Sequence, residues 1–298
     1  MRIPGLGDVS PIDLGKQSIG NFLKHDMTTY AAALSYAILF ALFPFLIFLI
    51  SLLSVLDLQS FFDWMLEQAQ SAFPADAYQR FSDIVTQLRS QQRGGLLSIG
   101  VIAAIWGASG GVRSLMNALN VTYDVEETRS MVKRYGLSVL YTIGIAVLMV
   151  AATALMLLGP DSFEWLADQV GMGQVAVTIW TILRFPVLIA IMMIVCALVY
   201  YVGPNVDQPF RLISPGAVVA VVVWLVASIG FSIYVSNFGN YNATYGSLGG
   251  VIVLLLYFYL SCAVLLLGAE INAELHRQVI GEPEPGDSPD NQDDAAAT

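Results

Sequence analysis

The stretch GSLGGVIVLLLYFYLSCAVLLLG, residues 246–268, contains no charged side chain and is apolar along most of its length. An α-helix rises 1.5 Å per residue, so a helix of this length reaches about 34 Å and can cross the roughly 30 Å hydrocarbon core of a bilayer. Backbone groups in lipid find no water, and a single spanning segment satisfies them only as a helix. The stretch therefore predicts a transmembrane helix.

Five further segments share this apolar character, and almost every charge lies between them. They cover about residues 31–56, 95–112, 137–159, 175–203 and 213–235. The predicted fold class is an all-α polytopic membrane protein with six transmembrane helices. Residues 31–277 form its membrane domain, preceded by a cytoplasmic segment at residues 1–30.

The composition supports a membrane protein and argues against a nucleic-acid partner. The 298 residues are 56% hydrophobic and only 12% charged, whereas soluble domains carry about 25% charged residues. The net charge of −10 is the wrong sign for binding nucleic acid. Residues 281–298 hold six acids, no base and three prolines, so we expect residues 278–298 to form a disordered cytoplasmic tail.

The segment between the first two spans, residues 57–94, repeats its apolar side chains at helical spacing on both sides of Pro74. This pattern predicts two amphipathic helices that lie over the bundle or on the membrane surface. With a cytoplasmic N-terminus, nine Lys and Arg residues fall on the inner side and four on the outer side. The positive-inside rule therefore favours a cytoplasmic location for both termini.

Two prolines lie inside predicted spans, and short matches around them raise the hypothesis of an internal repeat. Pro44 and Pro186 should kink or break their helices and would be candidate gating positions. FPFLI at residues 43–47 resembles FPVLI at residues 185–189, and two further short matches follow in the same order. Three spans per half would make this an inverted repeat, an architecture of secondary transporters. Chance similarity between short apolar motifs is the alternative.

No catalytic signature occurs in the chain, so we predict no catalytic residue, no metal site, no cofactor and no enzyme activity. Cys196 and Cys262 fall in apolar spans and are expected to be small buried hydrophobes. The uncharged segment at residues 237–250 is dense in amides and hydroxyls. It is either a cavity-lining turn that binds a polar or anionic solute, or a tight turn held by Asx hydrogen bonds.

Glu270 follows the last span at a membrane boundary, where an ionisable group is a functional candidate. The competing interpretation is a structural ion pair with Arg113 or Arg211.

Several segments together resemble the YihY/BrkB family of bacterial inner-membrane proteins over roughly residues 15–277. They are DMTTYAAALSY at 26–36, LFP at 42–44, ALNVTY at 118–123, PGA at 215–217, NYNATYGSLGG at 240–250 and LGAEINAE at 267–274. The resemblance implies a six-helix protein of the bacterial inner membrane with a poorly defined activity. Family members have been linked by name to virulence and serum resistance, and some to lipid or lipopolysaccharide handling; an old ribonuclease label also attaches to the family.

The function we expect is a permease or flippase-like transporter for a polar or lipid-linked substrate. Its partners would be membrane lipids and a polar solute or lipid headgroup, with no nucleic acid. The proposed lining groups are Tyr36, Asn117, Asn120, Asn240, Asn242, Tyr245 and Glu270.

A non-transporting envelope scaffold or assembly factor is the alternative function. Ribonuclease activity is disfavoured, because RNA hydrolysis needs a carboxylate cluster that binds metal or a His/Lys acid–base set on a basic surface. The substrate, the direction, any coupling ion and the oligomeric state stay open.

Overall fold

The computed structural model describes residues 10–55, 94–157, 174–236 and 247–280, with a few residues between 66 and 86 and residue 163. Within these residues the chain forms helices and no strand, so the all-helical class is confirmed there. The helices are α1 (Pro11–Lys24), α2 (Met27–Val55), α5 (Gly94–Thr122), α6 (Met131–Leu157), α8 (Gln174–Val202), α9 (Pro215–Ser236) and α11 (Ser247–Ile280).

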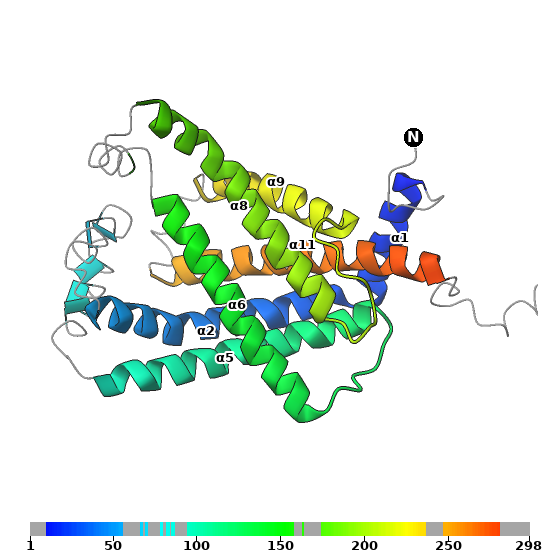
Figure 1. Ribbon diagram of the computed structural model, residues 1–298, viewed down its shortest axis with the longest axis horizontal. Helices are drawn as coiled ribbons and strands as arrows, with labels where there is room; N and C mark the ends of the chain where they lie inside the picture. The colour runs from blue at the N-terminus through cyan, green and yellow to red at the C-terminus, as the bar shows by residue number, and fades with distance from the viewer. Residues whose placement is uncertain are drawn as a thin grey trace, which may run out of the picture.

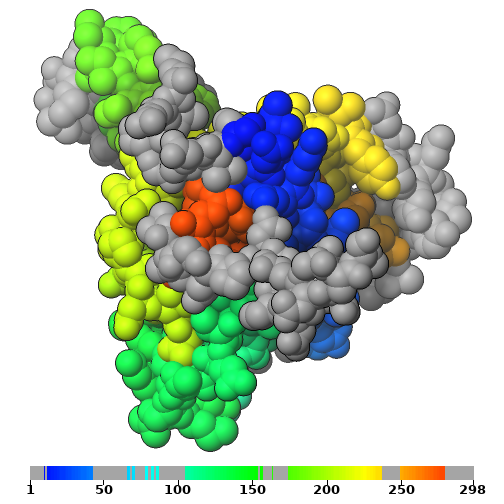
Figure 2. All heavy atoms as spheres, turned by 90° about the vertical axis from the view of Figure 1, so that its right-hand side faces the viewer, coloured from blue at the N-terminus to red at the C-terminus, as the bar shows by residue number. Residues whose placement is uncertain are grey.

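The last helix, α11, is the centre of the arrangement and contacts α1, α2, α5, α8 and α9. The helices α2, α5 and α11 run alongside one another, whereas α6 and α8 cross them obliquely (Figure 1). The helix α1 lies across the end of α11, which places the described beginning and end of the chain at the same end of the bundle (Figures 1 and 2). We call this the terminal end.

Four described helices are long and apolar enough to cross a membrane: α6, α8, α9 and α11. A fifth apolar stretch, Met27–Leu42, lies in α2. Six crossings and the inverted repeat therefore stay predictions. The first two predicted spans coincide with α2 and α5, whose side chains at residues 43–55 and 94–104 lie outside the described part.

Three of the apolar helices present large hydrophobic side chains to the outside of the bundle. Leu140 on α6 is 63% exposed, Ile182 on α8 is 67% exposed, and Val226 on α9 is 65% exposed. Such surface is unfavourable in water but matches lipid tails. The exposure of these helices therefore agrees with a bilayer around them.

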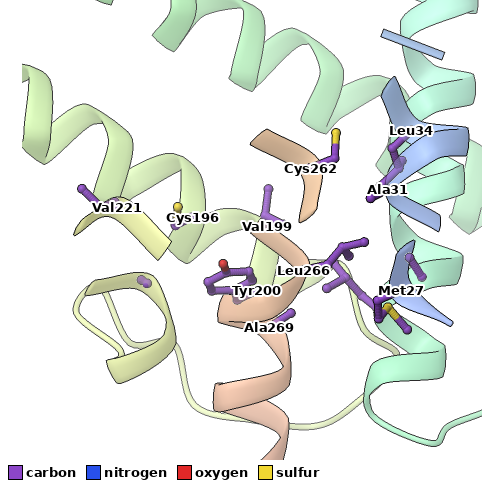
Figure 3. Close-up of a cluster of buried hydrophobic side chains, with 13 residues drawn as sticks. Met27, Ala31, Leu34, Cys196, Val199, Tyr200, Val221, Cys262, Leu266 and Ala269 are labelled. Atoms are coloured by element: carbon purple, nitrogen blue, oxygen red, sulfur yellow. The ribbon is translucent and has the colours of Figure 1, made fainter. Parts of the chain in front are cut away.

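The apolar core joins α11 to the helices on either side of it (Figure 3). From α2, Met27, Ala31 and Leu34 meet Leu266 of α11 within one buried cluster. The same cluster includes the two cysteines, which are free and buried as expected. Further members come from α5, α8 and α9: Ala118, Leu119, Val199, Tyr200, Ala217 and Val221.

The helices α9 and α11 approach each other at two glycines. A Cβ atom added to Gly216 would overlap the carbonyl oxygen of Gly268 and come within 2.7 Å of the Asn272 side chain. A Cβ atom added to Gly268 would lie 2.7 Å from the carbonyl oxygen of Gly216 and 2.8 Å from Ala220 Cβ. Small residues allow this backbone approach, which is a common way to pack helices in membranes.

The helix α1 was not predicted from the sequence, although its start carries recognisable signals. Ser10 is the N-cap and accepts a hydrogen bond from the backbone N–H of Ile12 at 3.3 Å, and Pro11 occupies the first helical position. Both features stabilise a helix start. Between α1 and α2, Asp26 takes a left-handed conformation with φ of 55°, which lets the chain turn sharply into α2.

The structure also bears on three other sequence predictions. The helix α8 continues through Pro186, and α2 continues through position 44, so neither helix is interrupted there. One proline removes only one helical hydrogen bond, and neighbouring helices can support the rest.

The helix α11 extends to Ile280, so the predicted tail at 278–298 begins inside it. The insert at 57–94 lies largely outside the described residues, and the few described ones are helical.

Candidate functional site at the terminal end

A cluster of ionisable side chains lies at the terminal end, where α1, α2, α5 and α11 meet, and all of its side chains except that of Asp124 are buried. Its members, which we call the ionic cluster, are His25, Asp124, Glu270, Glu274 and Arg277. Glu270 is fully buried, and Glu274 and Arg277 are 3% and 6% exposed. Burying charges is costly unless they are paired, so the contacts within this cluster decide what it can do.

One half of the ionic cluster is an interlocked set of hydrogen bonds around Arg277. Its Nη2 donates to Glu274 Oε2 at 3.1 Å, and its Nη1 donates to Asp124 Oδ2 at 3.2 Å and to the Thr122 carbonyl oxygen at 3.1 Å. Glu274 also accepts from Asn21 Nδ2 of α1 at 3.0 Å. This half therefore ties α1 and the end of α5 to α11.

The other half is a contact between His25 and Glu270. His25 Nδ1 lies 2.9 Å from Glu270 Oε1, and His25 Nε2 lies 3.6 Å from Asp124 Oδ1. The second carboxylate oxygen of Glu270 is buried and makes no hydrogen bond within the described residues. The Thr122 hydroxyl lies near enough to Glu270 to act as a donor to it and also lies 3.5 Å from Met27 Sδ. In the geometry shown, the second Glu270 oxygen is an acceptor without a hydrogen-bond donor.

A cavity of about 300 Å³ opens near the ionic cluster, between the end of α8, the loop at residues 203–214 and α11. More of its surface is apolar than polar, and we call it the polar cavity only because charged and amide side chains line part of it. Its polar lining consists mainly of Asp207, Gln208, Arg211, Ser214, Asn272 and His276. Asn272 forms part of the wall and also supports the start of α9. It accepts from the backbone N–H of Gly216 at 2.9 Å and donates to Ser214 Oγ at 2.9 Å.

Tyr123 lies between the polar cavity and the ionic cluster. Its ring packs 5.9 Å from the ring of His276 in the cavity wall. Burial raises the pKa of Tyr123 well above its ordinary value; the Gln208 amide and the Arg277 charge lower the pKa by smaller amounts. At neutral pH Tyr123 therefore keeps its hydroxyl proton. Its uncharged side chain separates the polar cavity from the ionic cluster.

A second polar group at the terminal end joins the loop after α5 to the loop after α8. Arg129 donates from Nε to Glu127 Oε1 at 2.7 Å and from Nη2 to Glu127 Oε2 at 2.8 Å. It also donates to the carbonyl oxygens of Val202 and Gly203, at 3.0 Å each. The hydrogen bonds from Arg129 lower the pKa of Glu127. Asn120 completes the group by donating to Glu127 Oε2 at 3.1 Å and accepting from the Asn205 backbone N–H at 2.8 Å.

Among the described residues, the structure does not bring the predicted lining residues Tyr36, Asn117, Asn120 and Glu270 together in one site. Tyr36 is 58% exposed on α2 and packs against Phe40. Asn117 is exposed and accepts a hydrogen bond from Arg134 Nη2, while Asn120 is engaged in the Glu127 group. Of the described candidates, only Glu270 belongs to the ionic cluster, and it pairs with His25 rather than with Arg113 or Arg211.

Three predicted lining residues, Asn240, Asn242 and Tyr245, lie outside the described residues. The expected metal-free character also stays a prediction, although no group of three or more potential ligands was found in the described part. Residues missed from the sequence are His25, Asp124, Arg277, Tyr123 and Asn272. One available signal was the spacing of Glu270, Glu274 and Arg277, which places three ionisable groups on one helical face.

Comparisons with known proteins agree with the family resemblance. Residues 18–293 match the family described as Virulence factor BrkB. The ribonuclease-like protein YfkH of Bacillus subtilis is 38% identical over 263 residues, which cover 88% of this chain and 95% of that protein.

Two other relatives carry the name UPF0761 membrane protein. The one from Stenotrophomonas maltophilia is 28% identical over 275 residues, 89% of this chain and 61% of the relative. The one from Tolumonas auensis is 40% identical over 78 residues, 26% of each chain. No solved structure matches this chain. The family match over most of the sequence, together with the apolar helices, places the chain in the Virulence factor BrkB family of membrane proteins.

Proposed function

We propose that the protein is a membrane permease or flippase that moves a polar or lipid-linked substrate by alternating access. The supporting observation is the ionic cluster beside the polar cavity at the terminal end. Ionisable side chains in the interior of a membrane protein are expensive and commonly mark substrate or ion pathways. The open Glu270 oxygen would give such a pathway an acceptor for a cation, a proton or a substrate N–H or O–H group.

We assign the candidate binding site to the polar cavity instead of to the lining residues expected from the sequence. Arg211 and His276 can donate to an anionic headgroup, and Asn272 and Gln208 can donate to or accept from hydroxyl groups. A cavity of about 300 Å³ is at the lower end of the range for small ligands. It would hold a headgroup while the acyl chains stay in the membrane.

Transport is tested by reconstituting the full chain in liposomes with acyl-labelled fluorescent phospholipids and measuring their movement between leaflets. Glu270→Gln preserves side-chain volume and should slow movement at least tenfold. Glu126→Gln makes the same chemical change at an exposed position and should leave the rate unchanged. Equal rates for protein-containing and protein-free liposomes across a panel of phospholipids and polar solutes would overturn the proposal.

A non-transporting scaffold is the second candidate. The observation in its favour is that Asn117 and Asn120, expected to line a pathway, are used in hydrogen bonds that join loops and helices. A scaffold predicts a stable protein partner recovered with the solubilised chain, together with no transport in the liposome experiment.

We also infer that the ribonuclease-like name of the Bacillus subtilis relative does not describe this chain. RNA hydrolysis needs acid–base groups that reach solvent beside a phosphate-binding surface, whereas His25 is 7% exposed and the chain carries a net charge of −10. Purified protein freed of soluble nucleases should leave RNA intact. Cleavage that is lost in His25→Gln would contradict this inference.

A further inference from the structure

Arg113 on α5 is a half-buried cation with no carboxylate within ion-pair distance in the described residues. Its Nη1 donates to Ser109 Oγ at 3.0 Å and to Ser138 Oγ of α6 at 3.1 Å. Its guanidinium carbon lies 4.2 Å from the centre of the Tyr135 ring. These contacts hold the guanidinium in one orientation at the seam between α5 and α6 without neutralising it.

Part of the guanidinium stays available. The described hydrogen bonds of Arg113 use only Nη1, and neither Nε nor Nη2 is among the enclosed polar atoms that lack a partner. The N–H groups on these two atoms therefore reach the surface of the seam. Together they form the planar edge that binds a phosphate or carboxylate through two parallel hydrogen bonds.

The seam lies where a bilayer surface would be. The apolar stretch of α5 ends at residue 112, and the apolar stretch of α6 begins at residue 137. Trp106 is 68% exposed and Tyr135 is 42% exposed, with ring centres 6.5 Å apart. Trp106 precedes Arg113 by seven residues, which is about 10 Å along a helix toward the hydrocarbon core. Exposed Trp and Tyr are typical of the headgroup level.

We propose that this seam binds an anionic phospholipid of the leaflet at the terminal end. The phosphate would accept hydrogen bonds from Arg113 Nε and Nη2, and an acyl chain would lie against Trp106. A cation held at a membrane boundary without a protein counter-charge favours an anion there. A lipid phosphate is the anion already present at that depth. This site is separate from the polar cavity and does not depend on the transport proposal.

The experiment uses the purified full chain in detergent micelles and phospholipids with brominated acyl chains, which quench nearby tryptophan. The Trp106 contribution is the difference between the wild type and Trp106→Phe. Brominated phosphatidylglycerol should quench Trp106 at about one tenth of the concentration needed for brominated phosphatidylcholine. Both lipids carry the phosphate, but in phosphatidylcholine the choline cation offsets its charge. Arg113→Gln should therefore remove this preference of about tenfold, because it removes the fixed positive charge that favours an anionic over a zwitterionic lipid.

Lys133→Gln is the matched control, because it removes one positive charge from the same end of α6. Lys133 is exposed and lies about 140° around the helix from Ser138. It should change the preference less than twofold. Equal losses in the two variants, or equal quenching by the two lipids in the wild type, would overturn the proposal.

Ser138→Ala tests the same site in case the Arg113→Gln variant does not fold. It keeps the charge and removes one hydroxyl that orients the guanidinium, so it should weaken the preference about threefold. The protein should stay folded with a slightly lower melting temperature, because a buried hydroxyl that makes hydrogen bonds is lost. An unchanged preference in this variant would contradict the assigned geometry. Inorganic phosphate at the lipid concentrations used should not restore fluorescence; restoration would mean a free-phosphate site and would also overturn the proposal.

Discussion

At the scale of single residues, the strongest constraint is the contact between His25 and Glu270. The two side chains are 245 positions apart in sequence and both are buried. Removal of one partner would leave the other as an unsatisfied polar group in the interior. Such a group costs about 1–3 kcal/mol.

Glu270→Ala should therefore lower the stability of the protein by about 2–4 kcal/mol, from the lost hydrogen bond and the cavity left behind. Glu270→Gln should cost less, because an amide oxygen can still accept from His25. The measurement is the unfolding midpoint in detergent, with Glu126→Ala as an exposed control that should shift it little. Matching midpoints for Glu270→Ala and the control would show that the buried pair contributes nothing.

The partner of Glu270 is a residue-level feature that the sequence does not predict. Glu270 was identified as a candidate because it follows an apolar span, but its partner could not be chosen. The ion-pair interpretation offers Arg113 or Arg211 as examples of a partner, since a full positive charge is the usual partner of a carboxylate. His25 lies on the chain segment before α2, and only the crossing of α1 over α11 brings it to Glu270.

At the scale of elements, the contact between α9 and α11 depends on two glycines and one asparagine. Gly216 and Gly268 let the backbones meet, and Asn272 binds the start of α9. The motifs PGA at 215–217 and LGAEINAE at 267–274 therefore have a packing explanation: they are the two halves of one helix contact.

Gly216→Ala should separate these helices and destabilise the protein by about 2–3 kcal/mol, because the added methyl group meets backbone that cannot move aside. Gly230→Ala is a control on the same helix, since a Cβ there has nothing within 4 Å. It should be neutral or slightly stabilising by helix propensity. Both variants can be compared by thermal unfolding in detergent; similar midpoints would contradict the close approach.

Helices that consist of one long apolar run were predicted well from the sequence, and helices or helix ends with mixed polarity were predicted less well. The bounds of α8 and α9 agree with the predicted spans to within two residues, because a long apolar run leaves one solution in lipid. The helix α1 was missed because it is short and amphipathic, so its hydropathy does not stand out as that of a long apolar span does. The extension of α11 to Ile280 was missed because helix continuation past the bilayer depends on packing against α1 and α5.

At the scale of the whole molecule, the packing of α1 across the end of α11 brings the beginning and end of the described chain together at the terminal end. The uneven distribution of Lys and Arg predicts that this end faces the cytoplasm. The compartment predicted for this end therefore follows from the charge distribution.

A fluorescent protein fused to either terminus should therefore fold and fluoresce in the cytoplasm, and alkaline phosphatase fused to either terminus should be inactive. A reporter inserted in the segment between α6 and α8 should give the opposite pattern. Termini that report different compartments would mean an odd number of crossings and would contradict the six-span topology.

The central place of α11 has a consequence for biosynthesis. The ribosome makes α11 after all the other described helices, yet it provides Glu270 for His25 and Arg277 for Asp124. Until α11 is inserted, the nascent protein carries polar groups at the membrane edge whose partners do not yet exist. Chains cut short before residue 270 should therefore be substrates for membrane quality-control proteases rather than smaller working proteins.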